Sequence, residues 1–239
     1  MSKTEQAYQK LRHDILFTRL LPDAPLNLKK LCETYGFGWT PIREALARLE
    51  SEQLVQSREN RGFTVAPVSE SDLKDLTQAR LTVELAMLRE AMECGDEAWE
   101  ENIVTAHFRL SRFKVDARTL TDADFDAWEV LHDGFHRAVL AACPSKTLHY
   151  FYDHVNAHLL RHRKFLAISP AIKATQDGAG DVENVLGSLE NAVALEGHTD
   201  IMNAVIDRDV EQAVQLLSDH IQLTRKVFSV AKPAADTAL

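Results

Sequence analysis

The segment from Thr40 to Val68 constrains the fold more than any other part of this chain. It opens with an apolar stripe at helical spacing, with Arg43 on the opposite face and Arg48 at its border. Two β-prone runs follow, around a polar turn that ends at Gly62. A basic helix followed by a basic hairpin suits the major groove of DNA and the phosphates beside it. The alternative is an ordinary amphipathic helix and hairpin whose arginines are solvated.

The residues before this segment predict two further helices. Residues 5–19 have apolar side chains at helical spacing, and a proline-containing stretch ends that helix. Asn27 is a suitable N-cap for the second helix. Thr40 is expected to cap the third, with Pro41 in its first turn. Three helices followed by a hairpin make a winged helix-turn-helix domain, which we predict over residues 1–69.

The pattern beyond Ser69 is helical throughout. The clearest loop is predicted at residues 169–181, which contain Pro170 and two glycines. Six helices are expected, at residues 69–94, 96–115, 122–143, 146–168, 182–206 and 209–230. The sequence therefore predicts a mainly α fold, with a six-helix antiparallel bundle over residues 70–230 and a flexible tail over 231–239.

The charge is distributed unevenly between the two parts. The net charge is −9, from 27 Lys and Arg against 36 Asp and Glu, but residues 1–70 hold 10 basic and 9 acidic residues. A near-neutral N-terminal domain with a basic face can bind phosphates, whereas the acidic remainder discourages indiscriminate contact with DNA. The chain has no apolar run of membrane-spanning length, no signal-peptide profile and three widely spaced cysteines. We expect a cytoplasmic protein with no membrane partner.

Two motifs of the N-terminal part recur in a known family: Thr40-Pro41-Ile42-Arg43-Glu44-Ala45-Leu46 and Arg61-Gly62-Phe63-Thr64-Val65. With them the chain resembles the GntR superfamily of bacterial transcription factors, in its FadR branch with a helical FCD effector domain. Six C-terminal helices rather than seven favour the VanR-like subgroup. The stretches GDEAWEENIVTAH, LHDGFHRAVLAAC and GHTDIMNAVIDRD further resemble CsiR-type repressors of small-carboxylate catabolism. The resemblance implies a ligand-responsive regulator and not an enzyme.

The resemblance also implies a set of DNA contacts. Carried over position by position, these are Lys29, Trp39, Thr40, Arg43, Arg48 and Gly62. The family commonly has a DNA-contacting arginine where this chain has Trp39, which could instead pack on a sugar or a thymine methyl, or fill the edge of the domain core. A glycine in the wing allows close approach to the minor groove. Arg43 is the strongest candidate, as a bidentate partner of guanine.

Four histidines of the C-terminal part match a metal site of the resembled family. His132 and His136 are four residues apart, so they project from the same face of one helix. The other two matching positions, on the last two helices, are His198 and His220. The family more often has an acidic residue at the first position, so this chain would offer four neutral imidazoles. Imidazole ligands suit a divalent metal such as Zn²⁺, with Ni²⁺ as a second choice.

The resemblance implies an acidic effector and a symmetric assembly. Arg80 and Arg163 are the expected effector-binding arginines, because guanidinium groups bind carboxylates in a two-pronged manner. Each could equally be a surface residue or pair with Glu84 or Asp153. A homodimer would bind double-stranded operator DNA with two-fold symmetry, most often as a repressor in this family.

Three alternatives remain open from the sequence. The first is a zinc-dependent hydrolase using His132-Asp133-x-x-His136, with Asp133 as general base. The second is a winged helix that binds only proteins. The third concerns the metal alone, because His154, His158 and His162 form another stripe at helical spacing. We expect that stripe to be solvated or to face a dimer partner.

Overall fold

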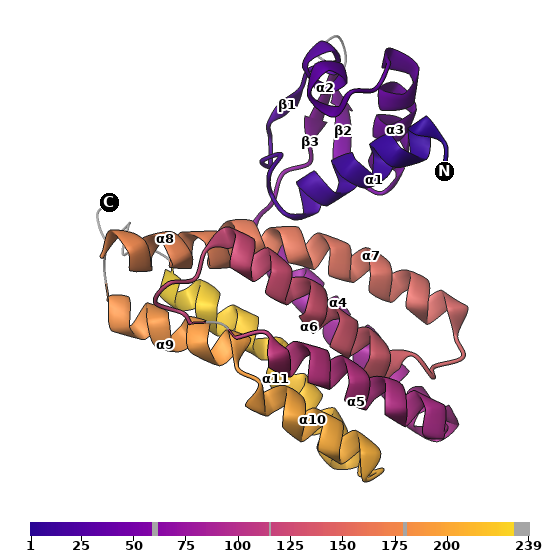
Figure 1. Ribbon diagram of the computed structural model, residues 1–239, viewed down its shortest axis with the longest axis vertical. Helices are drawn as coiled ribbons and strands as arrows, with labels where there is room; N and C mark the ends of the chain where they lie inside the picture. The colour runs from indigo at the N-terminus through magenta and orange to yellow at the C-terminus, as the bar shows by residue number, and fades with distance from the viewer. Residues whose placement is uncertain (59–61, 115, 179–180, 232–239) are drawn as a thin grey trace.

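A small N-terminal domain rests on a larger helical domain in the computed structural model of this protein, as Figure 1 shows. The structure describes residues 1–58, 62–114, 116–178 and 181–231. The turn of the expected wing (59–61) and nearly all of the predicted tail (232–239) lie outside the described residues. No helix in the described ranges is both long enough and apolar enough to cross a membrane.

The N-terminal domain has the predicted winged helix-turn-helix order, with one additional strand. Its elements are α1 (Lys3–Leu16), β1 (Pro25–Leu26), α2 (Leu28–Tyr35), α3 (Trp39–Ser51), β2 (Val55–Arg58) and β3 (Gly62–Val65). The strands form an antiparallel sheet in the order β1-β3-β2, so the strand that the sequence did not predict lies at the edge. The side chain of Asn27 accepts a hydrogen bond from the Lys30 amide at 3.1 Å, as expected of an N-cap.

The start of α3 differs from the prediction. The helix begins at Trp39, and Gly38 occupies the N-cap position without a side-chain hydrogen bond. The predicted cap at Thr40 is therefore wrong, because this residue already lies in the first turn. The apolar side of α3 is buried as expected, through Ile42, Ala45, Leu46 and Leu49. Burial of this stripe leaves the opposite side of α3 facing outward.

The C-terminal domain consists of long helices that pack around one apolar core. Its elements are α4 (Glu70–Cys94), α5 (Glu97–Arg112), α6 (Asp122–Leu140), α7 (Lys146–Arg163), the π-helix η1 (Lys164–Ile168), α8 (Ser169–Asp177), α9 (Val182–Val193), α10 (Glu196–Ile206) and α11 (Val210–Ala231). Ser69 caps α4 by accepting a hydrogen bond from the Asp72 amide at 3.1 Å. Leu88, Phe135, Leu189 and Leu217 are among the buried core residues contributed by different helices.

The described part of the C-terminal domain has eight α-helices rather than the six predicted, because the helix boundaries differ in two places. The loop predicted at residues 169–181 is wrong over its first part, because α8 continues directly from the π-helix. Pro170 lies in the first turn of α8, and Gly178 ends that helix in a left-handed conformation. The helix predicted over 182–206 is interrupted at Ala194, which is extended with ψ of 139°. Neither glycine nor proline marks this break in the sequence.

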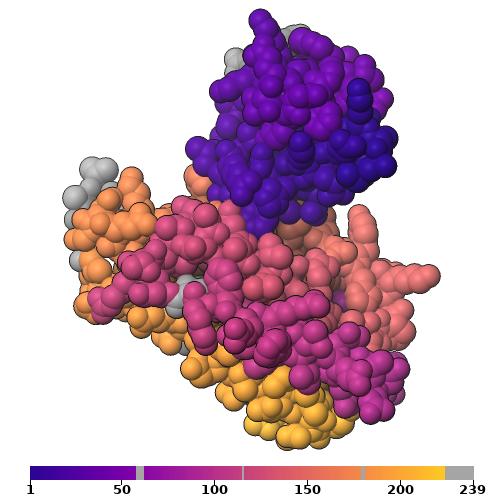
Figure 2. Space-filling model, viewed as in Figure 1, coloured from indigo at the N-terminus to yellow at the C-terminus, as the bar shows by residue number. Residues whose placement is uncertain are grey.

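Helix α7 is the main contact between the two domains. Its residues Ala157 and Leu160 pack against the apolar core of the N-terminal domain. In the space-filling view of Figure 2, the indigo N-terminal domain rests on the helical domain. The helix that contacts the N-terminal domain is thus also part of the helical bundle.

Candidate metal centre and nucleic-acid interface

The four predicted histidines converge at one point inside the helical domain. Helix α6 supplies His132 and His136, α10 supplies His198, and α11 supplies His220. One ligand nitrogen from each lies within 4.8 Å of all the others. The first three side chains are buried and His220 is half-buried. The structure therefore brings together the whole set that the resemblance implied.

The spacing of three ring nitrogens matches a tetrahedral metal site. The Nε2 atom of His136 lies 3.2 Å from Nε2 of His132 and 3.2 Å from Nε2 of His220, and the remaining pair is 3.4 Å apart. Metal–nitrogen bonds of zinc length at the tetrahedral angle would place ligand nitrogens about 3.3 Å apart. Without a cation, no arrangement of single protons can join three mutually facing nitrogens by hydrogen bonds. The geometry therefore fits a metal ion better than a network of neutral imidazoles.

The environment keeps these imidazoles in the form that binds metals. Burial lowers the pKa of His132, His136 and His220 well below the ordinary value, and it lowers the pKa of His198 to about 4. Neutral imidazole offers a nitrogen lone pair to a metal, whereas the protonated ring offers none. The four imidazoles are consequently neutral and able to bind a cation at neutral pH.

The break between α9 and α10 positions His198. The Nδ1 atom of His198 lies 2.9 Å from the carbonyl oxygen of Ala194, the residue whose extended backbone ends α9. A carbonyl only accepts, so Nδ1 carries the proton and Nε2 carries a lone pair. That Nε2 atom is buried without a hydrogen-bond partner among the residues that the structure describes. It is thus available as the fourth ligand.

Two buried glutamates lie beside the histidines, a role that the sequence analysis predicted for neither of them. Glu84 Oε2 lies 3.7 Å from Nδ1 of His136, and Glu129 Oε2 lies 3.6 Å from Nδ1 of His132. Carboxylates in this place orient a metal-bound imidazole and favour the tautomer with a proton on Nδ1. The only available signal was helical spacing, because Glu129 precedes His132 by three residues.

The two predicted effector-binding arginines are buried and already paired. Arg80 Nε donates to Glu84 at 2.5 Å, which confirms one of the anticipated partners, while Arg163 pairs with Glu129 rather than with Glu84 or Asp153. Arg80 is 4% exposed and Arg163 is 7% exposed, so neither is a surface residue. Both line a cavity of about 20 Å³ beside His132 and His220. A cavity of this size has room for one water-sized group.

The geometry rejects the hydrolase alternative. Asp133 does not line the cavity beside the histidines. Its carboxylate accepts hydrogen bonds from Arg137 and Asn156, both at 2.6 Å, and from Tyr152 at 3.2 Å. A general base must reach the water or substrate at the metal, and this carboxylate faces a different pocket. The proposed role of Asp133 as a catalytic base is therefore wrong.

The second histidine stripe faces the other domain. His158 and His162 are buried, and His158 Nε2 lies 2.8 Å from the carbonyl oxygen of Glu52 in the N-terminal domain. His162 Nδ1 is 2.7 Å from the carbonyl oxygen of His158. The expectation that this stripe is solvated or faces a dimer partner is wrong for these two residues, because they lie at the domain junction.

The predicted DNA contacts divide into exposed residues and one that is internally paired. Lys29, Thr40 and Arg43 are exposed, and Trp39 is 60% exposed, so it does not fill the edge of the core. Arg48 donates to Glu5 at 2.7 Å and therefore links α3 to α1. Gly62 has φ of +75°, a conformation that other residues adopt only with strain.

Comparison with known proteins agrees with this arrangement. The family of bacterial regulatory proteins named gntR matches residues 3–65, and the FCD domain family matches residues 75–223. The regulator BphR of Paraburkholderia xenovorans, described as HTH-type, is 30% identical over 225 residues, covering 92% of this chain and 83% of the relative. The HTH-type transcriptional repressor GlaR of Escherichia coli is 28% identical over 214 residues, covering 90% of each chain.

A solved structure shares the fold over almost the full length. The E. coli protein McbR/YncC superposes with a TM-score of 0.70 at 20% identity, covering 96% of this chain and 98% of that one. Together with the two domain matches and the winged helix above the histidine site, these similarities give one assignment. The chain belongs to the GntR family of bacterial regulatory proteins, in the branch with an FCD domain, and is a DNA-binding transcriptional regulator rather than an enzyme.

Proposed function

We propose that this protein is a repressor that binds operator DNA as a homodimer and responds to a small organic acid through a metal in its helical domain. The DNA contacts would come from Lys29, Trp39, Thr40 and Arg43, all on the outward side of the winged domain. Gly62 would let the wing approach the backbone closely. A two-fold dimer would require two matching half-sites in the operator. Assignment to the VanR-like subgroup and to the CsiR type stays a prediction.

The single observation that carries the metal proposal is the spacing of the three Nε2 atoms, 3.2, 3.2 and 3.4 Å. His132, His136, His198 and His220 would hold the ion, and Zn²⁺ suits imidazole ligands and this geometry. The ion would supply positive charge and a position at which a carboxylate oxygen can bind. Glu84 and Glu129 would keep two of the rings oriented.

The charge of the site supports an anionic effector. Arg80 and Glu84 offset one another, as do Arg163 and Glu129, so a divalent ion among neutral imidazoles would leave two buried positive charges. Buried charge is costly unless it is paired, and carboxylates of an effector would pair it. The small cavity means that such an acid must displace a glutamate from an arginine or widen the site. We expect a dicarboxylate or a related hydroxy or amino acid of four to six carbons.

Native mass spectrometry of the full-length protein tests this proposal directly. The expected result is a dimer with one metal per chain, together with any co-purified acid. Footprinting on promoter fragments, repeated after adding candidate acids, should show a protected pseudo-palindrome that is released by one of them. A monomer without metal, or protein without preference for any promoter fragment, would refute the corresponding part of the proposal.

A further inference from the structure

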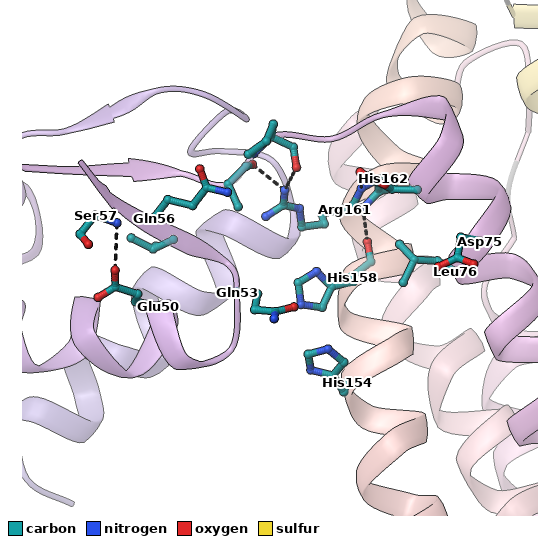
Figure 3. A pocket seen from close by; sticks show the side chains of 14 residues that line it. Glu50, Gln53, Gln56, Ser57, Asp75, Leu76, His154, His158, Arg161 and His162 are labelled. Carbon is teal, nitrogen blue, oxygen red and sulfur yellow. Dashed lines mark hydrogen bonds and ion pairs between the residues drawn. The ribbon is translucent and has the colours of Figure 1, made fainter. Parts of the chain in front are cut away.

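The side chain of one arginine of α7 is hydrogen-bonded to backbone carbonyl groups of the DNA-binding domain and the linker after it. Arg161 Nη2 donates to the carbonyl oxygens of Ala66 and Pro67, both at 2.5 Å, and Nη1 lies 3.5 Å from that of Leu54. The side chain is 1% exposed, and burial lowers its pKa to about 10. Together with the contact from His158 to Glu52, these bonds form an interdomain clasp where the wing joins the linker to α4. Figure 3 shows Arg161 and His158 on α7 facing the N-terminal domain.

The rest of the junction beside this clasp is open. A hollow of about 640 Å³ lies against it, lined by residues of α3, the turn after it, β2, α4 and α7, among them Gln53, Asp75 and His154. The bonds of the clasp therefore add to the packing of Ala157 and Leu160 in joining the two domains beside this hollow. A small shift of the last turn of α7 would alter all of them together.

The same turn of α7 also reaches the histidine site. Arg163 lies two residues after Arg161, and two residues correspond to about 200° around an α-helix, so the two side chains leave on opposite sides. Arg163 pairs with Glu129, whose Oε2 is 3.6 Å from Nδ1 of His132. The helix then passes into the π-helix Lys164–Ile168, and π-helical turns frequently occur at functional sites.

We propose that the last turn of α7 carries the state of the histidine site to the DNA-binding domain, with Glu129 and Arg163 at one end and Arg161 at the other. This inference rests on the proposed metal function. With an ion held at Nε2, the ring proton of His132 would stay on Nδ1 and would be attracted more strongly to Glu129. Glu129 is then shared between His132 and Arg163, which weakens its bond to Arg163 and loosens the end of α7. The hydrogen bonds from Arg161 to the carbonyl oxygens of Ala66 and Pro67 then weaken as well.

The amide of Ala66 reports on the clasp. It donates to the carbonyl oxygen of Leu54 at 3.0 Å, which also faces Arg161. Hydrogen-exchange mass spectrometry of the full-length protein, with Zn²⁺ alone as the probe, would measure exchange in the peptide over residues 62–69. In the wild type, saturating zinc should speed this exchange by about threefold, because a loosened clasp opens more often. Native mass spectrometry of the same samples gives the zinc content.

Four variants test this relay, the path from Glu129 and Arg163 through the last turn of α7 to Arg161. Arg161→Met should exchange about tenfold faster at Ala66 without zinc, because it loses hydrogen bonds from a charged donor, and zinc should add nothing further. Glu129→Gln should still bind saturating zinc but should lose the zinc response at Ala66. Arg112→Met, which removes an exposed arginine from α5, should behave as the wild type. Arg161→Lys keeps the charge and should exchange at an intermediate rate, which guards against misfolding of the methionine variant.

The outcomes that contradict the relay are distinct from those that contradict the metal proposal. Absence of zinc from the wild-type protein would refute the metal proposal, and the relay with it. Bound zinc with unchanged or slower exchange at Ala66 would refute the relay alone. A zinc response that persists in Arg161→Met would do the same.

Discussion

The guanidinium of Arg48 donates to Glu5 at 2.7 Å and lies over the ring of Tyr8, 3.8 Å from its centroid. This contact joins the outward side of α3 to α1 within the winged domain. Arg43, on the same helix, is exposed and is free of such a contact in the described part of the chain. The two arginines that the sequence placed together as DNA contacts are therefore expected to behave differently on substitution.

Arg43→Ala should weaken operator binding and leave folding intact. Loss of a bidentate contact to guanine should cost about 1–3 kcal/mol of binding free energy. Arg48→Ala should instead lower the urea midpoint slightly and leave operator affinity less affected, because it removes an exposed ion pair and a cation–π contact. Fluorescence anisotropy with operator DNA and urea denaturation measure the two effects. Unchanged operator affinity in Arg43→Ala would contradict the placement of α3 in the groove.

The double variant His136→Ala/His198→Ala should lose the metal. It removes one ligand from α6 and one from α10, whereas His13→Ala/His154→Ala removes two histidines outside the site and should retain it. Zinc at one hundred times its Kd should stabilise the wild type by about 2.7 kcal/mol and leave the first variant unaffected. Elemental analysis and thermal denaturation with and without zinc make the comparison. One metal per chain in the first variant would place the ion elsewhere.

The sequence predicted the winged domain and the four histidines because their signals are local or are carried by the family resemblance. The apolar stripe of α3 and the N-cap at Asn27 follow from helical spacing and from one short-range hydrogen bond. The pairing of Arg80 with Glu84, four residues apart on one helix, was likewise among the alternatives.

The parts that the sequence did not predict depend on contacts between distant residues. Arg163 at the end of α7 pairs with Glu129 of α6, a contact that no spacing along the chain shows. His158 and Arg161 bind backbone carbonyl groups of the N-terminal domain. Every residue has such a carbonyl, so the side chains at these N-terminal positions do not reveal the contacts. The break at Ala194 is stabilised by tertiary packing and by a histidine four residues later.

Glu84→Gln should destabilise the protein more than removal of both members of its ion pair. The substitution leaves Arg80 buried without its counter-charge, which typically costs about 3–5 kcal/mol, whereas Arg80→Met/Glu84→Leu replaces the pair by apolar groups. Urea denaturation of both variants and of the wild type in zinc-free buffer gives the comparison. Equal destabilisation of the two variants would mean that the pair contributes chiefly through packing.

Acidification should weaken the domain junction through His158. Burial, with smaller effects from His154, Arg161 and His162 beside it on α7, lowers its pKa to about 4, against an unfolded value near 6.5. Because the unfolded chain binds the proton more readily, the stabilisation is fully present above pH 6.5 and is lost as the pH falls towards 4. Between pH 7.5 and 5.5, the wild type should lose about 1 kcal/mol more than His158→Gln.

Urea denaturation at the two pH values, with a chelator present, measures this difference, because the pH dependence of the other histidines is common to both proteins. His13→Gln, at an exposed histidine of α1, is the matched control and should retain the wild-type pH dependence. An identical loss of stability in His158→Gln and the wild type would show that the contact from His158 to Glu52 is not maintained in solution. In that case Arg161 would be the remaining side chain of the clasp that is bonded to the N-terminal domain.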